Sequence, residues 1–352
     1  MISIAKLEEF LFARYDKKEF PALLEQINFW KENTPLAGVK ILDATPVFYN
    51  TGLKYLALLY AGADLTVSAH PALPSDVDAV KFFLSCGIPV VSDDSRESFD
   101  CICDCAGMHK NTPSKYGVVE LTGSGAHAYR NWDRPVFLAD GGKVKVLETG
   151  LGTGNGLLRA LQQLGADIIS GREILIFGGG KVGSGVALAL DGAGAHCTIV
   201  DQLDRIRCKS SRVSVLSTED KEAIVKAIAN SSGIVTATGI KNAVANYASE
   251  LLASDAVLMN IGVEDEYGAD VPENRVLNHK KPLNFILDEP TLLRYIDPTM
   301  ALSNYGVTEL LNNRCANGIN LPPEKLENSL LESVSRGAAA ADLPKLEEFY
   351  YE

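Results

Sequence analysis

Residues 171–201 read GREILIFGGGKVGSGVALALDGAGAHCTIVD, and this stretch decides the fold that we expect for the chain. The short apolar run EILIF at residues 173–177 is typical of a buried strand. Three glycines with the spacing G-x-G-x-x-G follow it, and the apolar, alanine-rich residues 182–190 predict a helix. Residues 197–200, CTIV, predict a second strand that ends at Asp201. The pattern therefore predicts a strand–turn–helix–strand unit.

Each glycine of the motif has a mechanical role in binding a dinucleotide. Gly178 makes the tight turn, Gly180 lets the backbone approach a pyrophosphate, and Gly183 lets helix and strand pack closely. The free N–H groups at the start of the helix, which begins with Lys181 and Val182, face the phosphates together with the positive end of the helix dipole.

Asp201 indicates which dinucleotide the motif would bind. A carboxylate at the end of the second strand accepts hydrogen bonds from the adenosine ribose hydroxyls, and its charge repels a 2′-phosphate. The alternative is an ordinary glycine-rich turn between a strand and a helix, but here strand, turn, helix, second strand and acid occur in register. We therefore expect NAD, rather than NADP, as the cofactor.

The composition sets the class of protein. A length of 352 residues favours two domains, each able to bury its own core, and contents of 46% hydrophobic and 22% charged residues are those of a globular protein. The net charge of −12 argues against nucleic acid or an anionic membrane surface as a partner. No run is long enough for a transmembrane helix, the N-terminal residues lack a signal-peptide pattern, and the 7 cysteines are typical of reduced thiols. We expect a cytoplasmic protein with a small-molecule substrate.

The first half of the chain alternates between strand-like and helix-like segments. Residues 1–36 predict two amphipathic helices, and further helices are expected at 53–63 and 76–86. Strands are expected within residues 36–47, 65–68, 88–91, 99–105 and 117–122. Alternation of this kind predicts a parallel, doubly wound sheet. We therefore expect a substrate-binding α/β domain over residues 1–150.

A second, Rossmann-like domain is expected over residues 151–304. The glycine-rich and polar residues 140–156 predict a hinge or linker, in which Asn155 would cap a helix over residues 156–164. Beyond the glycine motif, the expected elements are strands at 213–216, 233–236, 256–261 and 283–287 and a helix at 219–230. Residues from about 308 onward predict acidic helices that return to the first domain and complete it over about 305–352. The fold class is therefore α/β, with two doubly wound, mostly parallel sheets and a C-terminal helical return.

Cys101, Cys103 and Cys105 alternate along an expected strand and so would share one face. A thiolate metal site is one interpretation. However, no C-x-x-C pair or histidine cluster accompanies these residues, and neighbouring positions on one strand face do not converge tetrahedrally. We therefore expect three buried thiols and no metal site.

The order of several further segments resembles that of the adenosylhomocysteinase family. Residues 36–68 resemble the family's first strand–helix–strand, and residues 135–154, PVFLADGGKVKVLETGLGTG, stand where the family has a lysine-bearing segment before its hinge. The other matches are FDCICDCAG at 99–107, GVVELTGSGAHAY at 117–129, the glycine motif, TATG at 236–239 and NIG at 260–262. The resemblance implies a substrate domain, a hinge and an NAD domain, in a homo-oligomer that would be a dimer or a tetramer. The C-terminal tail does not resemble that of the family.

The resemblance also implies roles for single residues. In the family, NAD takes a hydride from a ribose carbon, a base removes the proton that the resulting ketone acidifies, and a thiol leaves. Lys145 matches the lysine that handles the sugar hydroxyl, and Glu120 matches the first of two adjacent acids, of which the second is Leu121 here. The positions that match cofactor contacts, or that reach the nicotinamide end, are Thr122, Ser124, Thr236, Thr238, Gly239 and Asn260. Pro46 and Val263 stand at two histidines that serve the departure of the thiol, which argues against hydrolysis.

The three candidate catalytic residues each have an alternative interpretation. Lys145 handles the proton of the substrate, or it is a solvated linker lysine. Glu120 contacts the substrate, or it caps the glycine- and serine-rich loop after its strand. His127 follows the same loop and is the histidine expected nearest the cleft, so it is either a proton carrier or a surface residue. Cys105 stands at a family aspartate, with Asp104 beside it.

These features together predict an NAD-dependent enzyme. We expect NAD and a small polar substrate in a cleft between the two domains, at the carboxyl ends of the strands. The expected reaction is oxidation of a secondary alcohol or amine on a nucleoside- or amino-acid-like metabolite. The alternatives are a catalytically inactive NAD-binding regulator and, third, a true adenosylhomocysteine hydrolase.

Overall fold

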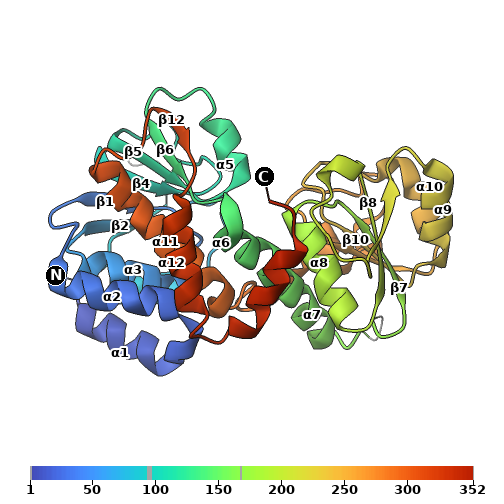
Figure 1. The fold of residues 1–352 in the computed structure, drawn as a ribbon, viewed down its shortest axis with the longest axis horizontal. Helices are drawn as coiled ribbons and strands as arrows, with labels where there is room; N and C mark the ends of the chain where they lie inside the picture. Colours follow the sequence, from blue (N-terminus) through green and yellow to red (C-terminus); the bar gives the residue numbers. More distant parts are fainter. Residues whose placement is uncertain (1, 93–96, 167–168, 352) are drawn as a thin grey trace. The chain divides into compact units, whose positions relative to one another are not determined.

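The computed structural model describes residues 2–92, 97–166 and 169–351. The chain divides into two compact units, Met1–Lys145 with Leu293–Ala341, and Val146–Leu292 with Asp342–Glu352. Each unit is built on one parallel β-sheet with helices against it (Figure 1). The predicted α/β class with two doubly wound sheets is therefore confirmed. No helix of the described residues is both long enough and apolar enough to cross a membrane.

The sheet of the first unit combines strands from both ends of the chain. Its strands are β1 Lys40–Asp43, β2 Asp64–Ser68, β3 Val90–Val91, β4 Phe99–Asp104, β5 Ser114–Glu120, β6 Pro135–Leu138 and β12 Gly318–Asn320. Their order is β12-β6-β5-β4-β1-β2-β3, and every neighbouring pair is parallel. Strands β1 to β5 overlap the predicted segments, whereas β6 and β12 are additional to them. The strand order reverses between β1 and β4, as in dinucleotide-binding folds.

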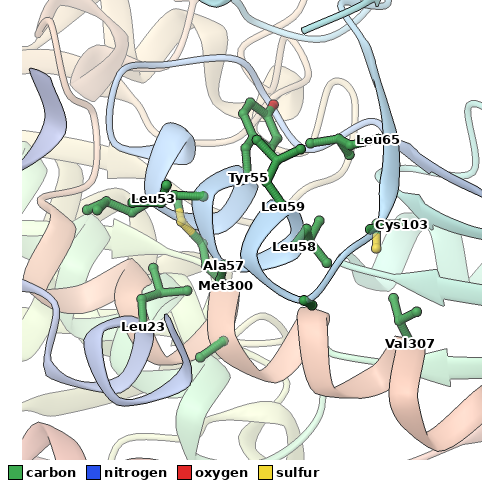
Figure 2. Packing of buried hydrophobic residues seen from close by; sticks show 14 of the residues in the cluster. Leu23, Leu53, Tyr55, Ala57, Leu58, Leu59, Leu65, Cys103, Met300 and Val307 are labelled. Carbon is green, nitrogen blue, oxygen red and sulfur yellow. The ribbon is translucent and has the colours of Figure 1, made fainter. Parts of the chain in front are cut away.

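Helices of the first unit pack on this sheet and on one another. They are α1 Ile4–Arg14, α2 Pro21–Asn33, α3 Thr51–Tyr60, α4 Val77–Ser85, α5 Gly123–Ala128, α11 Leu293–Leu311 and α12 Glu324–Val334. Figure 2 shows Leu53 and Leu58 of α3 in one cluster with Leu23 of α2 and Met300 of α11. This cluster is a hydrophobic core of the unit. It combines apolar side chains from helices and from strands, and their removal from water stabilises the fold.

Two of the alternating cysteines, Cys101 and Cys103, lie on one face of β4, and Cys105 directly follows this strand. Cys101, Cys103 and Cys105 are buried in the same cluster, while Ile102 between them packs into a second core on the opposite face. The predicted buried thiols on a shared face are therefore confirmed. Burial raises the pKa of Cys103 to about 11, so its thiol stays protonated near neutral pH.

The second unit follows the predicted strand–turn–helix–strand order. Its strands are β7 Glu173–Phe177, β8 His196–Asp201, β9 Ser214–Ser217, β10 Gly233–Thr236 and β11 Val257–Asn260, and its helices are α7 Thr153–Gln163, α8 Lys181–Gly192, α9 Lys221–Asn230 and α10 Ala248–Ala253. The strand order is β11-β10-β7-β8-β9, all parallel. The order reverses at β7, so the carboxyl ends of β7, β8 and β10 frame a crevice.

The predicted linker at residues 140–156 is helical instead. Helix α6 spans Gly142–Val146, a π-helix spans Leu147–Gly152, and α7 follows directly. Its glycines serve packing rather than flexibility, since a Cβ on Gly154 would lie 2.6 Å from the carbonyl oxygen of Gly185 in α8. Asn155 lies within α7 and accepts a hydrogen bond from Arg159 Nε at 3.0 Å, so the prediction that it caps the helix is wrong.

The end of the second unit also differs from the prediction. Leu283–Ile286 form a 3₁₀ turn rather than a last strand, and their backbone bonds are local: Phe285 N donates to Pro282 O at 3.1 Å and Leu287 N donates to Asn284 O at 3.2 Å. The chain returns to the first unit at Leu293, where α11 begins, earlier than the expected residue 305.

A buried ion pair joins β1 and α3 in the first unit. Lys54 donates a hydrogen bond to Asp43, and both side chains are almost completely buried. Burial alone would lower the pKa of Lys54, but the Asp43 carboxylate, together with Cys103, raises it above its usual value. The pair therefore stays ionised inside the core, where each charge depends on the other.

Replacing one member of this pair tests its contribution. Lys54→Met should lower the free energy of unfolding by about 3–5 kcal/mol, because Asp43 is left buried without its counter-charge. The matched control is Lys81→Met, which breaks an exposed pair with Asp78 and should cost less than about 1 kcal/mol. Urea denaturation of both variants measures the difference, and equal losses would show that the buried pair has no special role.

Candidate functional site

The glycine turn between β7 and α8 leaves room for a ligand beside one of its glycines. Gly178 has a φ of +105°, and a Cβ there would lie 2.4 Å from the carbonyl oxygen of Ala237. A Cβ on Gly183 would lie 1.9 Å from the carbonyl oxygen of Gly178, so only glycine lets α8 begin this close to β7. At Gly180 a Cβ would meet nothing within 4 Å, and this glycine lines a pocket. Two glycines are thus required by packing, and the third opens onto the pocket.

The start of α8 faces the same pocket. Gly180 is the N-cap residue, and it has no side chain to bond the first N–H groups of this 12-residue helix. The N–H groups and the positive end of the helix dipole together favour an anion. Lys181, the first helical residue, lines the pocket, whereas Val182 is half-buried in the same turn and is not part of the lining. This arrangement suits a pyrophosphate.

Asp201 ends β8 beside the glycine turn. Its Oδ2 accepts a hydrogen bond from Gly179 N at 2.7 Å, and its Oδ1 accepts one from Gln202 N at 2.7 Å. Each carboxylate oxygen has a further lone pair, and the side chain lines the pocket. A ribose hydroxyl can therefore donate to Asp201 without displacing either backbone bond.

The pocket itself lies at the carboxyl ends of β7, β8 and β10. Its volume is about 720 Å³, which is within the usual range for sites that bind a small molecule or cofactor. The apolar part of the lining includes Phe177, Ile224 and Val244. The charged residues of the lining are Lys181, Asp201, Arg205, Arg207 and Lys221. The glycine turn, the helix start and the carboxylate thus fit a dinucleotide.

Glu266 is a residue of this site that sequence patterns do not reveal. It is completely buried, and its carboxylate accepts hydrogen bonds from Thr238 N, Thr238 Oγ1 and Gly239 N at 2.7–2.9 Å. Thr238 lines the pocket, so Glu266 fixes one wall of it. A Cβ on Gly262 would lie 1.9 Å from Glu266 Oε1, which explains the glycine of the N-I-G segment.

Thr236 and Asn260, which the resemblance places at the cofactor, lie behind the pocket. Thr236 Oγ1 donates to Asn260 Oδ1 at 2.9 Å, and both side chains are fully buried. Asn260 Nδ2 in turn donates to the carbonyl oxygens of Gly262, Glu264 and Lys280. These contacts hold the loops after β10 and β11 in place, and neither side chain is part of the pocket lining.

Two carboxylates occupy the carboxyl edge of the first unit's sheet. Asp104 ends β4 and Glu120 ends β5, and the two are directly paired across the strands. Glu120 accepts hydrogen bonds from Ala106 N, Gly107 N, Thr122 N and Thr122 Oγ1, at 2.7–3.1 Å. Thr122 Oγ1 also accepts from Gly125 N at 3.0 Å and so caps α5. Glu120 therefore holds two loops, as its structural interpretation predicts.

Asp104 is held by a different set of donors. It accepts hydrogen bonds from Tyr129 Oη at 2.6 Å, from Cys105 N at 2.8 Å and from His109 N at 3.0 Å. The His109 ring is fully buried, with Nε2 at 2.8 Å from Ser68 Oγ. Sequence reasoning missed His109, because a single histidine in a loop gives no pattern.

His127 lies outside this cluster. Its side chain is exposed, and Nδ1 is 3.0 Å from Arg130 Nη2. His109 lies beside Asp104, to which its backbone N, and not its ring, donates a hydrogen bond. Ser124 is exposed as well, 3.2 Å from Thr122 Oγ1.

Lys145 is buried, with an exposed fraction of only 3%. It lies in α6, which follows the carboxyl end of β6 in the parallel sheet. Lys145 therefore follows β6, which is the neighbour of β5 in the sheet. Glu120 is the last residue of β5. This burial excludes the interpretation of Lys145 as a solvated linker lysine.

Burial changes the acidity of the carboxylate pair. It raises the pKa of Glu120 from 4.5 to about 7, with the nearby Asp104 charge adding to the rise and the bonds from Thr122 and Gly107 opposing it. Burial also raises the pKa of Asp104, against the bonds from Tyr129 and His109. The pair therefore carries a proton at a pH where exposed carboxylates are fully ionised.

The pH dependence of stability should reveal this proton. Between pH 4.5 and about 7 the folded protein keeps the Glu120 proton while the unfolded chain has lost it, so stability falls as pH rises through this range. Glu120→Gln should remove about 3 kcal/mol of that fall, because an amide does not titrate. Denaturant unfolding across this range measures how the free energy of unfolding changes with pH in the unsubstituted protein and in Glu120→Gln. The same change with pH in both proteins would contradict the raised pKa of Glu120.

Substitutions of Gly183 and Gly180, at the start of α8, should have different effects: one on the stability of the fold and the other on the binding of NAD. Gly183→Ala should lower the free energy of unfolding by about 3 kcal/mol, since the new methyl group collides with the Gly178 carbonyl. Gly180→Ala should leave stability within about 1 kcal/mol but weaken NAD binding at least about tenfold, because the methyl group fills the space of the pyrophosphate. Thermal melting and calorimetric titration with NAD measure the two effects. Equal affinity of Gly180→Ala and the unsubstituted protein would contradict the site.

Known proteins resemble the chain over this site. Residues 149–281 match the family model described as S-adenosyl-L-homocysteine hydrolase, NAD binding domain. The adenosylhomocysteinase of Thermoplasma acidophilum is 26% identical over 310 residues, which are 79% of this chain and 74% of that protein. The corresponding protein of Thermoplasma volcanium is 24% identical over 318 residues, 80% of this chain and 76% of that protein.

Among solved structures, a dipicolinate synthase chain from Bacillus halodurans has a TM-score of 0.45 and 13% identity, covering 78% of this chain and 98% of that one. The pocket falls within the matched residues 149–281, and NAD is its cofactor. The chain therefore resembles adenosylhomocysteinases over most of its length, and most specifically in the NAD-binding domain.

Proposed function

We propose that the protein is an NAD-dependent enzyme that oxidises, at least transiently, a secondary alcohol or amine on a small nucleoside- or amino-acid-like metabolite. Two observations carry the proposal: the second unit has a pocket that fits NAD, and the first unit has a buried lysine, Lys145, after the carboxyl end of a parallel strand. Ligands of parallel α/β sheets bind at this edge. The relatives are named as adenosylhomocysteinases, which supports a metabolite of related chemistry.

The residues of the first unit would handle the proton of the substrate. NAD, when bound, supplies the hydride acceptor. Lys145, as a neutral amine, accepts the hydroxyl proton while the adjacent carbon loses its hydride, so that a C–O single bond becomes a carbonyl. Glu120 and Asp104 act on the substrate edge indirectly, because their carboxylates fix the loops around Ala106, His109 and Thr122.

The positions of two missing histidines argue against hydrolysis. Val263 is apolar and 82% exposed, and Pro46 has no group that can carry a proton. Departure of a thiol needs a protic group near the sulfur. We therefore propose oxidation and reduction of the substrate without release of a thiol.

The second candidate is a catalytically inactive NAD-binding regulator. Glu120 favours it, since both of its carboxylate oxygens are used by backbone and threonine donors of the protein itself. A carboxylate engaged in this way holds a loop and is poorly placed to act on a substrate. The regulator would bind NAD in the same pocket without turnover.

Substitution of Lys145 tests the enzymatic proposal. Purified protein with NAD and a panel of nucleosides, amino acids and their derivatives should produce the absorbance of reduced nicotinamide. Lys145→Ala should lower kcat at least about 100-fold, because proton removal loses its base. Its affinity for NAD should be unchanged, since Lys145 is not part of the pocket lining. The matched control is Lys115→Ala, which removes an exposed lysine of β5.

Three outcomes would overturn the proposal. Full activity of Lys145→Ala would reject the role of that residue. Tight binding of NAD with no turnover across the panel would favour the regulator. Release of homocysteine from adenosylhomocysteine, measured with a thiol reagent, would establish hydrolysis instead.

A further inference from the structure

Positive charge is concentrated at one edge of the NAD pocket, in a chain whose net charge is −12. Arg205 ends the 3₁₀ turn Leu203–Arg205 that follows β8, Arg207 comes two residues later, and Lys221 begins α9. All three side chains line the pocket beside Asp201. Lys181, the fourth cation of the lining, begins α8, where the pyrophosphate is expected.

Two of these three cations, Arg205 and Lys221, have no ion pair among the described residues. Asp201 is the single carboxylate in the pocket lining of the described residues. Asp220, the neighbour of Lys221, is turned away to cap α9, where it accepts a hydrogen bond from Ala223 N at 3.0 Å. The edge therefore has more positive charge than an unphosphorylated ribose requires.

We propose that Asp201 alone excludes the 2′-phosphorylated dinucleotide, and that Arg205, Arg207 and Lys221 form a ready-made subsite for a 2′-phosphate. In dinucleotide folds the residue at the end of this strand faces the ribose 2′-position, where a carboxylate accepts the hydroxyl and repels a phosphate. Guanidinium and ammonium groups bind phosphate through charge-assisted hydrogen bonds. The inference goes beyond the proposed function, since it rests on the NAD pocket and on no particular reaction.

The neutral variant Asp201→Asn isolates the charge. Asparagine has the shape of aspartate, and its single amide oxygen can still accept the bond from Gly179 N that anchors the glycine turn, while the bond from Gln202 N is given up. The variant therefore keeps the turn while removing the repulsion. Circular dichroism and thermal melting check that its fold is intact.

Dissociation constants for NAD and NADP, measured by calorimetric titration, test the proposal. The unsubstituted protein should prefer NAD at least about 100-fold, and Asp201→Asn should bind NADP at least about tenfold more tightly than the unsubstituted protein does. Adding Arg205→Ala and Lys221→Ala to Asp201→Asn should abolish this gain, and it should weaken the binding of NADP more than the binding of NAD. The gain should also shrink as salt is raised, because it depends on exposed charges.

Several binding results would overturn the inference, and activity of Lys145→Ala separates it from the proposed reaction. No gain in NADP affinity on Asp201→Asn, or a gain that survives removal of both cations, would show that no phosphate subsite exists. Equal binding of NAD and NADP by the unsubstituted protein would show that Asp201 does not select. If these binding results are as expected while Lys145→Ala keeps full activity, the proposed reaction fails and the subsite stands. Failure to bind either dinucleotide would reject both.

Discussion

The close approach of α8 to β7 is the constraint on which the second unit depends. The first turn of the helix meets the end of the strand at Gly183, where a single Cβ atom would lie 1.9 Å from a carbonyl oxygen. On its other side α8 meets the π-helix, since a Cβ on Gly185 would lie 2.2 Å from the carbonyl oxygen of Gly150. Backbone therefore packs on backbone around α8, and this fixes the direction of the helix start, where a pyrophosphate would bind.

Both units use a buried carboxylate to hold the loops at the carboxyl edge of the sheet. Glu120 and Glu266 each bind backbone N–H groups of a loop and the hydroxyl of a threonine in that loop. A carboxylate is suited to this task because it accepts several hydrogen bonds, and those bonds offset part of the cost of burying its charge. Loops at a binding edge are thereby fixed without regular secondary structure.

Much of the fold could be predicted from sequence, and less of the candidate site. The glycine motif and the apolar runs predicted β7, α8 and β8, because strand and helix periods are local properties. The strand β12 could not be predicted, since a three-residue strand gains its stability from pairing with β6 far away in the chain. The boundary between the two units does fall within the predicted linker at residues 140–156, between Lys145 and Val146. That this segment is helical could not be predicted, because glycine signals both flexibility and close packing, and only the position of α8 decides between them. His109 and Glu266 have no signal in the sequence, because tertiary contacts alone bring them to their sites.

The glutamates that hold the loops have a consequence for how relatives of this chain can vary. Glu120 occupies the space that a side chain at residue 125 would need, since a Cβ on Gly125 would lie 2.0 Å from its carboxyl carbon, and Glu266 does the same at Gly262. Each of these positions therefore requires glycine because a particular glutamate carboxylate fills the space of a Cβ atom. In an alignment of homologues these two pairs should covary. Where the glutamate is replaced by a smaller residue, the glycine position should accept other residues, and where the glycine is replaced, the glutamate should be absent.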